Sequence, residues 1–248
     1  MTRRRSLAVA LAVAGALAAV PAAASALTVY GASSLRDALP ALDGSPRYSF
    51  GGSNTLQLQI ERGAPADLFL GASPVEATAL YKEGLCTKPV TYATNVLTLI
   101  VPASNPAGIT SVGDLRKGGL RLSVGAAGVP IGNYTRTMLG RLRLTSVLSI
   151  NKVDLQPQVA NIAARVSLNA ADAGFVYVTD AKLAGSSVKQ VKLPTWAQPP
   201  VRYEGCVVKR NGADSDGASA YLAKLTGTPG RTVLKKYGFG LPKQPKKK

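Results

Sequence analysis

The chain of 248 residues contains no histidine and only two cysteines. Without histidine it cannot form a Ser-His-Asp triad, and two cysteines cannot complete a four-ligand zinc site. No Ser-x-x-Lys motif stands at a predicted helix start, which removes another type of serine nucleophile. We therefore expect neither a resident metal or cofactor nor catalysis of these kinds.

Acidic and aromatic residues are also scarce. There are 13 Asp and Glu against 30 Lys and Arg, a net charge of +17, and aromatic residues make up 6% of the chain. The basic residues are scattered singly, except in the tail Lys243-Gln244-Pro245-Lys246-Lys247-Lys248. Aromatic rings do not alternate with arginines as a nucleic-acid stacking surface requires. The positive charge therefore favours attraction of a small anion. Extracellular nucleic-acid binding is the weaker alternative, and we do not expect a nucleic-acid partner.

A single apolar run, Leu7–Val20, follows Arg3, Arg4 and Arg5 and precedes the small residues Ala24-Ser25-Ala26. A basic start, a short apolar segment and an A-x-A end are typical of a secretory signal peptide. A membrane anchor is the alternative, but the run is too short for one. We predict a signal peptide at residues 1–26, cleaved after Ala26. The exported chain would keep 27 of the 30 basic residues against 13 acidic ones, a net charge of +14.

Export makes Cys86 and Cys206 candidates for one disulfide, because such bonds persist in oxidising compartments. Two free buried thiols are the alternative, and the sequence contains no geometry with which to choose.

In the exported chain, β-prone runs alternate with helix-like segments, which indicates an α/β fold with largely parallel sheets. Two sets of these units, joined by β-prone crossings, predict two lobes, each a mostly parallel sheet flanked by helices, with a ligand cleft between them. We place the first lobe at 27–93 plus 204–248 and the second at 94–203.

Four predicted helix starts carry groups that suit an anion. The strand ending at Tyr30 leads into Ser34, which we expect to open a helix over Ser34–Leu42 in the manner of a capping box. Ser53 opens a second helix. Ile131 after Pro130, and Val159 after Pro157, supply backbone N–H groups at two more. Each residue alone has an ordinary structural explanation as a cap or a core residue.

If the two lobes face each other, these four helix starts converge on one small volume, because ligands in such folds bind at the carboxyl ends of the strands. Tyr177, at the end of a strand in the second lobe, would bring a phenol O–H to the same place. All five groups are neutral donors, which suits a fully ionised tetrahedral oxyanion that has no proton to give.

The ordered motifs resemble those of the periplasmic molybdate-binding proteins of ABC transporters, a type II solute-binding family. The likeness covers nearly the whole exported chain. It is carried by Val29-Tyr30-Gly31-Ala32-Ser33-Ser34-Leu35-Arg36-Asp37-Ala38, Phe50-Gly51-Gly52-Ser53-Asn54-Thr55-Leu56, Gly63-Ala64-Pro65-Ala66-Asp67-Leu68-Phe69, Val129-Pro130-Ile131-Gly132-Asn133-Tyr134 and Ala173-Gly174-Phe175-Val176-Tyr177-Val178-Thr179-Asp180-Ala181.

The resemblance implies a two-lobed periplasmic protein, expected to be monomeric, that closes on molybdate or tungstate and delivers it to a membrane permease. The family's ligand-contacting positions fall on Ser34, Ser53, Ile131, Val159 and Tyr177. Ile131 stands where the family usually has alanine, a change that keeps the main-chain donor.

Two other functions remain open at this point. Sulfate or a similar tetrahedral oxyanion is the nearer alternative, because the sequence does not reveal the cavity volume. A secreted hydrolase using the carboxylates of Asp67 and Asp180 is the alternative from another class, since we expect both residues to end strands. The usual role of aspartate at such turns is structural, and we expect no turnover.

Overall fold

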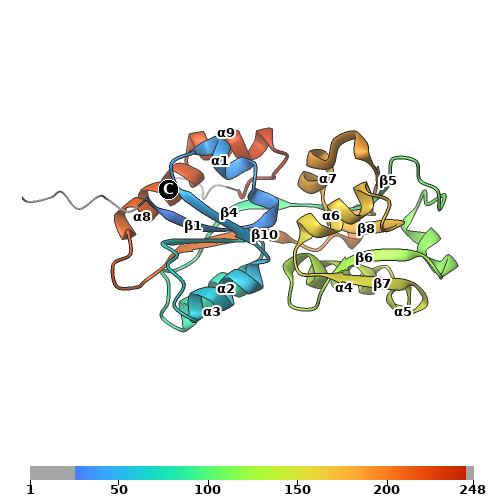
Figure 1. Ribbon diagram of the computed structural model, residues 1–248, viewed down its shortest axis with the longest axis horizontal. Helices are drawn as coiled ribbons and strands as arrows, with labels where there is room; N and C mark the ends of the chain where they lie inside the picture. Colours follow the sequence, from blue (N-terminus) through green and yellow to red (C-terminus); the bar gives the residue numbers. More distant parts are fainter. Residues whose placement is uncertain (1–25, 244–248) are drawn as a thin grey trace, which may run out of the picture.

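The computed structural model describes residues 26–243. Residues 1–25 of the predicted signal peptide lie outside the described residues. Ala26, after which we predict cleavage, is the first residue described. Two five-stranded sheets lie side by side, each with helices on both faces (Figure 1). This arrangement confirms the predicted two-lobed α/β fold. Within the described part of the chain, no helix is both long and apolar enough to cross a membrane.

The first sheet combines strands from both ends of the chain. β1 pairs in parallel with β2 and β3, whereas β10 pairs antiparallel with β3 and β4, so the sheet is mixed. The strands, in spatial order, are β2 (Arg47–Gly51), β1 (Thr28–Ala32), β3 (Leu68–Gly71), β10 (Val201–Val207) and β4 (Val90–Asn95). The helices of this lobe are η1 (Ser33–Leu35), α1 (Ala38–Leu42), α2 (Ser53–Glu61), α3 (Pro74–Lys82), α8 (Ser215–Thr226) and α9 (Thr228–Lys236).

The second sheet is built from the middle of the chain and is also mixed. β6 pairs in parallel with β7 and β8, and β5 pairs antiparallel with β8 and β9. Its order is β7 (Lys152–Gln156), β6 (Arg121–Gly125), β8 (Ala173–Tyr177), β5 (Leu97–Pro102) and β9 (Val188–Val191). Its helices are η2 (Val112–Lys117), α4 (Pro130–Arg141), α5 (Val147–Ile150), α6 (Val159–Ser167), α7 (Val178–Ala184), η3 (Gly185–Ser187) and η4 (Thr195–Ala197).

Two segments carry the chain between the sheets. It leaves the first sheet after Asn95 and enters the second at Leu97, and it returns to the first at Val201. The lobe limits predicted from the sequence, after residue 93 and before residue 204, remain a proposal.

Central strands of both sheets are apolar and buried along their whole length, as expected where helices cover both faces. Glycines in the strands let two helices pack closely against the second sheet, and this packing positions the first residues of those helices. A Cβ on Gly174 of β8 would lie 2.6 Å from Ile162 Cγ2 of α6, so glycine lets α6 approach the sheet closely. A Cβ on Gly125 would lie 2.6 Å from the backbone nitrogen of Gly132, which fixes the start of α4 against the end of β6.

A disulfide joins Cys86, in the loop after α3, to Cys206 of β10, with the two Cα atoms 5.8 Å apart. Both cysteines are fully buried, and they pack in an apolar cluster with side chains such as Phe69 and Leu80. The bond therefore ties the early and late parts of the first lobe together.

The predicted single helix over Ser34–Leu42 is wrong in detail. It divides into the short η1 and α1, with a turn at Arg36 and Asp37 between them. Ser34 lies inside η1, and its cap position is Ala32 with no side-chain cap, so the expected capping box is absent. The Ser34 hydroxyl instead lies 2.9 Å from the hydroxyl oxygen of Tyr203.

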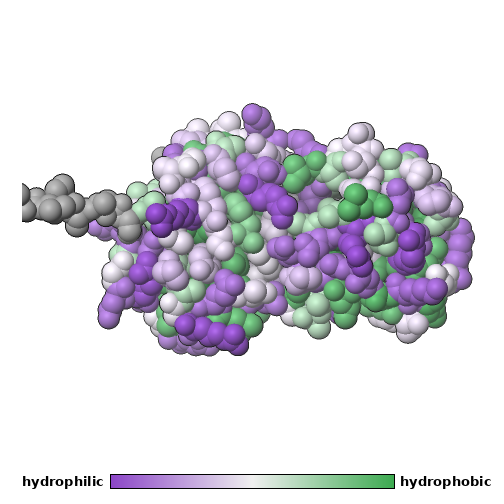
Figure 2. All heavy atoms as spheres, viewed as in Figure 1, coloured by the Kyte–Doolittle hydropathy of each residue, from purple (hydrophilic) through white to green (hydrophobic). Residues whose placement is uncertain are grey.

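Hydrophilic side chains cover much of the visible surface, with apolar residues in small separate groups over both lobes (Figure 2). Exposed large apolar residues in the described part include Trp196 in η4 and Leu168 after α6.

Candidate functional site

A small cavity lies between the lobes, with about 10 Å³ open to the centre of a water-sized sphere. All five residues singled out from the sequence, Ser34, Ser53, Ile131, Val159 and Tyr177, line it. Each stands at or just beyond the carboxyl end of a strand, namely β1, β2, β6, β7 and β8. The remaining lining residues, which sequence reasoning did not single out, are Ala32, Ser33, Gly51, Gly52, Ala72, Val129, Pro130 and Gln158.

The helix starts at this cavity keep their backbone N–H groups available. The cap positions of α2, α4 and α6 are Gly52, Val129 and Gln158, and none supplies a side-chain cap hydrogen bond. None of the three helices has an acidic residue in its first turn. By contrast, Ser73 and Asp214 cap α3 and α8, and both of those helices carry acidic residues in their first turns. The positive ends of three helix dipoles therefore meet at the cavity without a carboxylate to neutralise them.

The Ser53 hydroxyl is held in a defined orientation. Its Oγ accepts a hydrogen bond of 3.0 Å from the backbone N–H of Ala72, another residue that lines the cavity. Ser53 is only 2% exposed. Because the oxygen already accepts, the hydroxyl hydrogen remains free to donate to a ligand.

The Tyr177 hydroxyl is buried and has no hydrogen-bond partner among residues 26–243. Burial, together with the neighbouring Tyr203 and Tyr134, raises the pKa of Tyr177 well above its usual value of 10. The phenol therefore stays protonated and neutral. A buried hydroxyl without a partner costs free energy, and an anion in the cavity would supply the missing acceptor.

Gln158 is the lining residue with a side-chain amide. Its Nε2 donates to Asn161 Oδ1 over 3.1 Å, and its Oε1 is buried without a partner. Its position directly after Pro157 at a predicted helix start was the signal that could have identified it. Ala72 carried no such signal, because nothing in its own side chain marks a site.

No charged side chain lines the cavity within the described part of the chain, although three buried carboxyls, Asp67, Glu76 and Asp180, lie in the two lobes. Burial raises the pKa of Glu76, whose carboxylate accepts a hydrogen bond from the Ser73 hydroxyl. Burial also raises the pKa of Asp180 to about 7, against the lowering effects of nearby backbone N–H groups and of the Arg36 charge.

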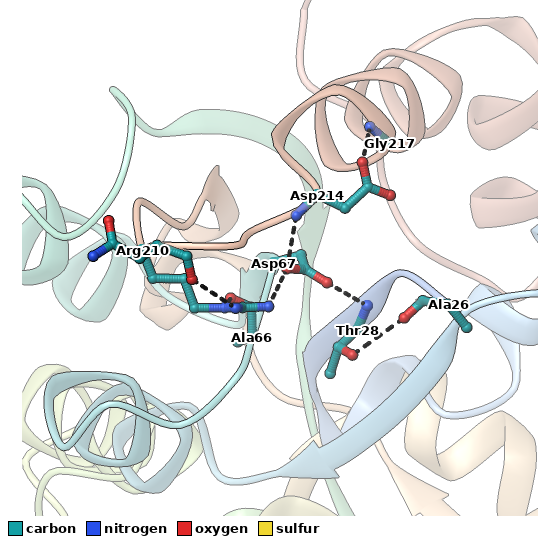
Figure 3. A network of polar contacts seen from close by, with 8 residues as sticks. Ala26, Thr28, Ala66, Asp67, Arg210, Asp214 and Gly217 are labelled. Atoms are coloured by element: carbon teal, nitrogen blue, oxygen red, sulfur yellow. Dashed lines mark hydrogen bonds and ion pairs between the residues drawn. The ribbon is translucent and has the colours of Figure 1, made fainter. Parts of the chain in front are cut away.

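Asp67 and Asp180 do not form a pair of catalytic carboxylates, and the expectation that both residues end strands is wrong. Asp67 precedes β3, at the end opposite Ala72 and the cavity, whereas Asp180 lies in α7 of the other lobe. Asp67 accepts hydrogen bonds from the backbone N–H groups of Thr28 and Asp214 and forms an ion pair with Arg210 (Figure 3). These contacts give Asp67 a structural role, joining the start of β1 to the segment before α8.

This chain is similar to a family of solute-binding proteins and to proteins named as molybdate-binding. Residues 27–240 match the family described as bacterial extracellular solute-binding protein. The molybdate-binding protein ModA of Haemophilus influenzae is 33% identical over 237 residues, covering 88% of this chain and 91% of that protein. ModA of Mycobacterium tuberculosis H37Rv is 31% identical over 226 residues, covering 87% of this chain and 85% of the relative. The solved periplasmic molybdate-binding protein of Azotobacter vinelandii shares the fold, with a TM-score of 0.77 at 22% identity over 88% of this chain and 100% of that one.

Proposed function

Because the chain belongs to the family of bacterial extracellular solute-binding proteins, we propose that it captures molybdate or tungstate and delivers the anion to the permease of an ABC transporter. It acts as a binding protein without catalysis. The signal peptide, cleaved after Ala26, places it in the periplasm, where it works as a monomer. The relatives named ModA support this choice of ligand.

The observation that carries the proposal is a cavity between the lobes with neutral donors and no charged lining residue. Ser34, Ser53 and Tyr177 provide hydroxyls, and Ile131 and Val159 provide backbone N–H groups at helix starts. Hydrogen bonds to a charged group contribute about 1.5–3 kcal/mol each, so several together offset the cost of removing a dianion from water. A counter-charge from Lys or Arg is not needed.

The donor set also favours a fully ionised anion over phosphate. Phosphate carries a proton near neutral pH, and a site selective for it needs a strong acceptor such as a carboxylate. Gln158 Oε1 is an amide oxygen, and a neutral acceptor is weaker than a carboxylate. Sulfate carries no such proton, so the donor set does not exclude it. Sulfate differs from molybdate mainly in size, and the titration must compare the affinities for the two anions.

Binding and lobe closure are coupled in this proposal. The donors come from η1 and α2 of the first lobe and from α4, α6 and β8 of the second. An anion that satisfies donors from both lobes binds the closed form more tightly than the open form, and so shifts the population towards closure. Closure then presents a distinct shape to the permease.

The test is calorimetric titration of residues 27–248 with molybdate, tungstate, sulfate and phosphate in moderate salt. We expect saturable one-to-one binding of molybdate and tungstate, with no heat from phosphate. The variant Ser34→Ala/Ser53→Ala should bind well over tenfold more weakly, since each lost donor to a charged ligand contributes about 1.5 kcal/mol or more. Ser219→Ala, at an exposed position of α8, is the matched control and should bind like the unmodified chain.

If sulfate binds most tightly, the ligand is sulfate and the proposed choice of molybdate or tungstate is wrong. If none of the four anions binds, the proposal is refuted. Unchanged affinity in the double variant would remove Ser34 and Ser53 from the site.

A further inference from the structure

Tyr203 stands directly behind the cavity without lining it. It lies in β10, is fully buried, and its hydroxyl oxygen is 2.9 Å from Ser34 Oγ. The rings of Tyr92, Tyr177 and Phe239 surround it, with ring centres 5.4–6.1 Å away and edge-to-face orientations. This packing fixes the phenol, and with it the point at which the Ser34 hydroxyl is contacted.

The contacts of Asn95 and Tyr203 favour one direction for the hydrogen bond between these two hydroxyls. Asn95 Oδ1 accepts the backbone N–H of Val96 over 2.9 Å, which orients the side-chain amide. Its Nδ2 then donates to Tyr203 Oη over 3.3 Å. An amide nitrogen can only donate, so Tyr203 Oη accepts from Asn95. In the described part of the chain, Ser34 Oγ is the one acceptor within hydrogen-bond distance of the Tyr203 hydroxyl, so the Tyr203 hydrogen is directed to it.

The consequence lies at Ser34. When its oxygen accepts from Tyr203, its own hydrogen must point elsewhere, and the described contacts give Ser34 Oγ no other partner. Because Ser34 lines the cavity, the hydrogen is directed to an anion there. Asn95 Nδ2 also donates to Thr179 Oγ1 of α7 over 2.9 Å, so this chain of donors touches both lobes.

We propose that Asn95 and Tyr203 are positioning residues that hold the Ser34 hydroxyl as an obligate donor to the bound anion. The inference rests on the proposed function and deepens it. Because Tyr203 occupies one of the two acceptor positions of the Ser34 oxygen and the Ser34 hydrogen is turned to the anion, Ser34 is less available to accept the proton of a hydrogen-bearing anion. The donor chain Asn95–Tyr203–Ser34 therefore raises discrimination against hydrogen phosphate. Burial raises the pKa of Tyr203 well above 10, which keeps its hydrogen in place.

The test is Tyr203→Phe, which keeps the ring and removes only the hydroxyl, combined with Ser34→Ala in a double-mutant cycle read by calorimetry with molybdate and phosphate. Tyr203→Phe alone should weaken molybdate binding about five- to tenfold, the effect of one lost orienting hydrogen bond. The ratio of phosphate to molybdate affinity should also rise. In the Ser34→Ala background the same change should alter molybdate affinity less than about twofold, because Tyr203 acts through Ser34.

Tyr92→Phe is the matched control. Tyr92 belongs to the same aromatic cluster, but its hydroxyl donates to the Gly71 carbonyl rather than to a site residue. Its loss should lower stability without changing the ratio of affinities. If Tyr203→Phe does not fold, Asn95→Ala carries the same cycle, since it removes the donor that sets the direction.

The outcomes separate the inference from the function. If the unmodified chain binds none of the oxyanions, the proposed function fails. If it binds molybdate while Tyr203→Phe binds equally well, the positioning role is refuted. It is also refuted if the loss is the same with and without the Ser34 hydroxyl, because that pattern means a purely structural effect.

Discussion

Breaking the disulfide between Cys86 and Cys206 should destabilise the exported protein strongly. The two cysteines are 120 positions apart, and the closed loop contains the whole second sheet. In the unfolded chain, the bond restricts all of that segment. The chain-entropy relation for a loop of this length gives about 5 kcal/mol of stabilisation. For a protein of about this size that corresponds to a fall in the unfolding midpoint of about 10–20 °C.

The measurement is thermal unfolding by circular dichroism of the oxidised chain, of the chain refolded under reductant, and of Cys86→Ala/Cys206→Ala. The reduced chain and the variant should melt at similar temperatures, well below the oxidised one. Both cysteines are fully buried. A reductant added to the folded protein should therefore act slowly unless denaturant is present.

Thiol titration supplies the independent check. The unreduced chain, opened in denaturant, should show no reactive thiol, and prior reduction should reveal both. Finding two free thiols in unreduced protein, or equal melting temperatures with and without the bond, would refute the reasoning.

Two further predictions concern buried aspartates. Asp180→Asn should stabilise the protein by on the order of 3–4 kcal/mol at pH 8 and change little at pH 4. Burial raises the pKa of Asp180 to about 7. Between about pH 4 and 7 the folded chain therefore holds a proton that the unfolded chain has lost, and stability falls as pH rises through this window. Thermal melts across pH check this, and a pH-independent difference would contradict it. Asp67→Asn should cost about 3 kcal/mol in urea unfolding, because it breaks a largely buried ion pair with Arg210. Molybdate affinity should stay unchanged, since Asp67 lies at the end of β3 away from the cavity; weaker binding at unchanged stability would argue against that role.

The location of the candidate site was predictable because it depends on local sequence signals. A β-prone run followed by proline or small residues marks a strand that leads into a helix, as at Pro130 and Pro157. In parallel units these junctions fall at one edge of a sheet. Ile131 and Val159 could thus be placed at the cavity as backbone donors, whatever their side chains.

Local signals failed where tertiary packing decides the structure. The apolar run Ala173-Gly174-Phe175-Val176-Tyr177-Val178 reads as one strand, yet Tyr177 ends β8 and is the cap position of α7. The division of the predicted helix at Arg36 and Asp37 also had no sequence mark. In both cases tertiary packing outweighs the intrinsic propensity of the segment.

The contacts at the crossing between the sheets could not be predicted from the sequence, because they join residues that are far apart in the chain. Gln198 forms two hydrogen bonds with the backbone of Leu97, accepting its N–H over 3.0 Å and donating to its carbonyl over 2.8 Å. These residues are 101 positions apart, and no periodicity relates them. The paired bonds tie the outgoing and returning segments to one another. Asn95 stands two residues before Leu97, and through Tyr203 it contacts Ser34. In the proposed donor chain, the orientation of a cavity hydroxyl is therefore set beside the crossing between the sheets, by residues that contact both lobes.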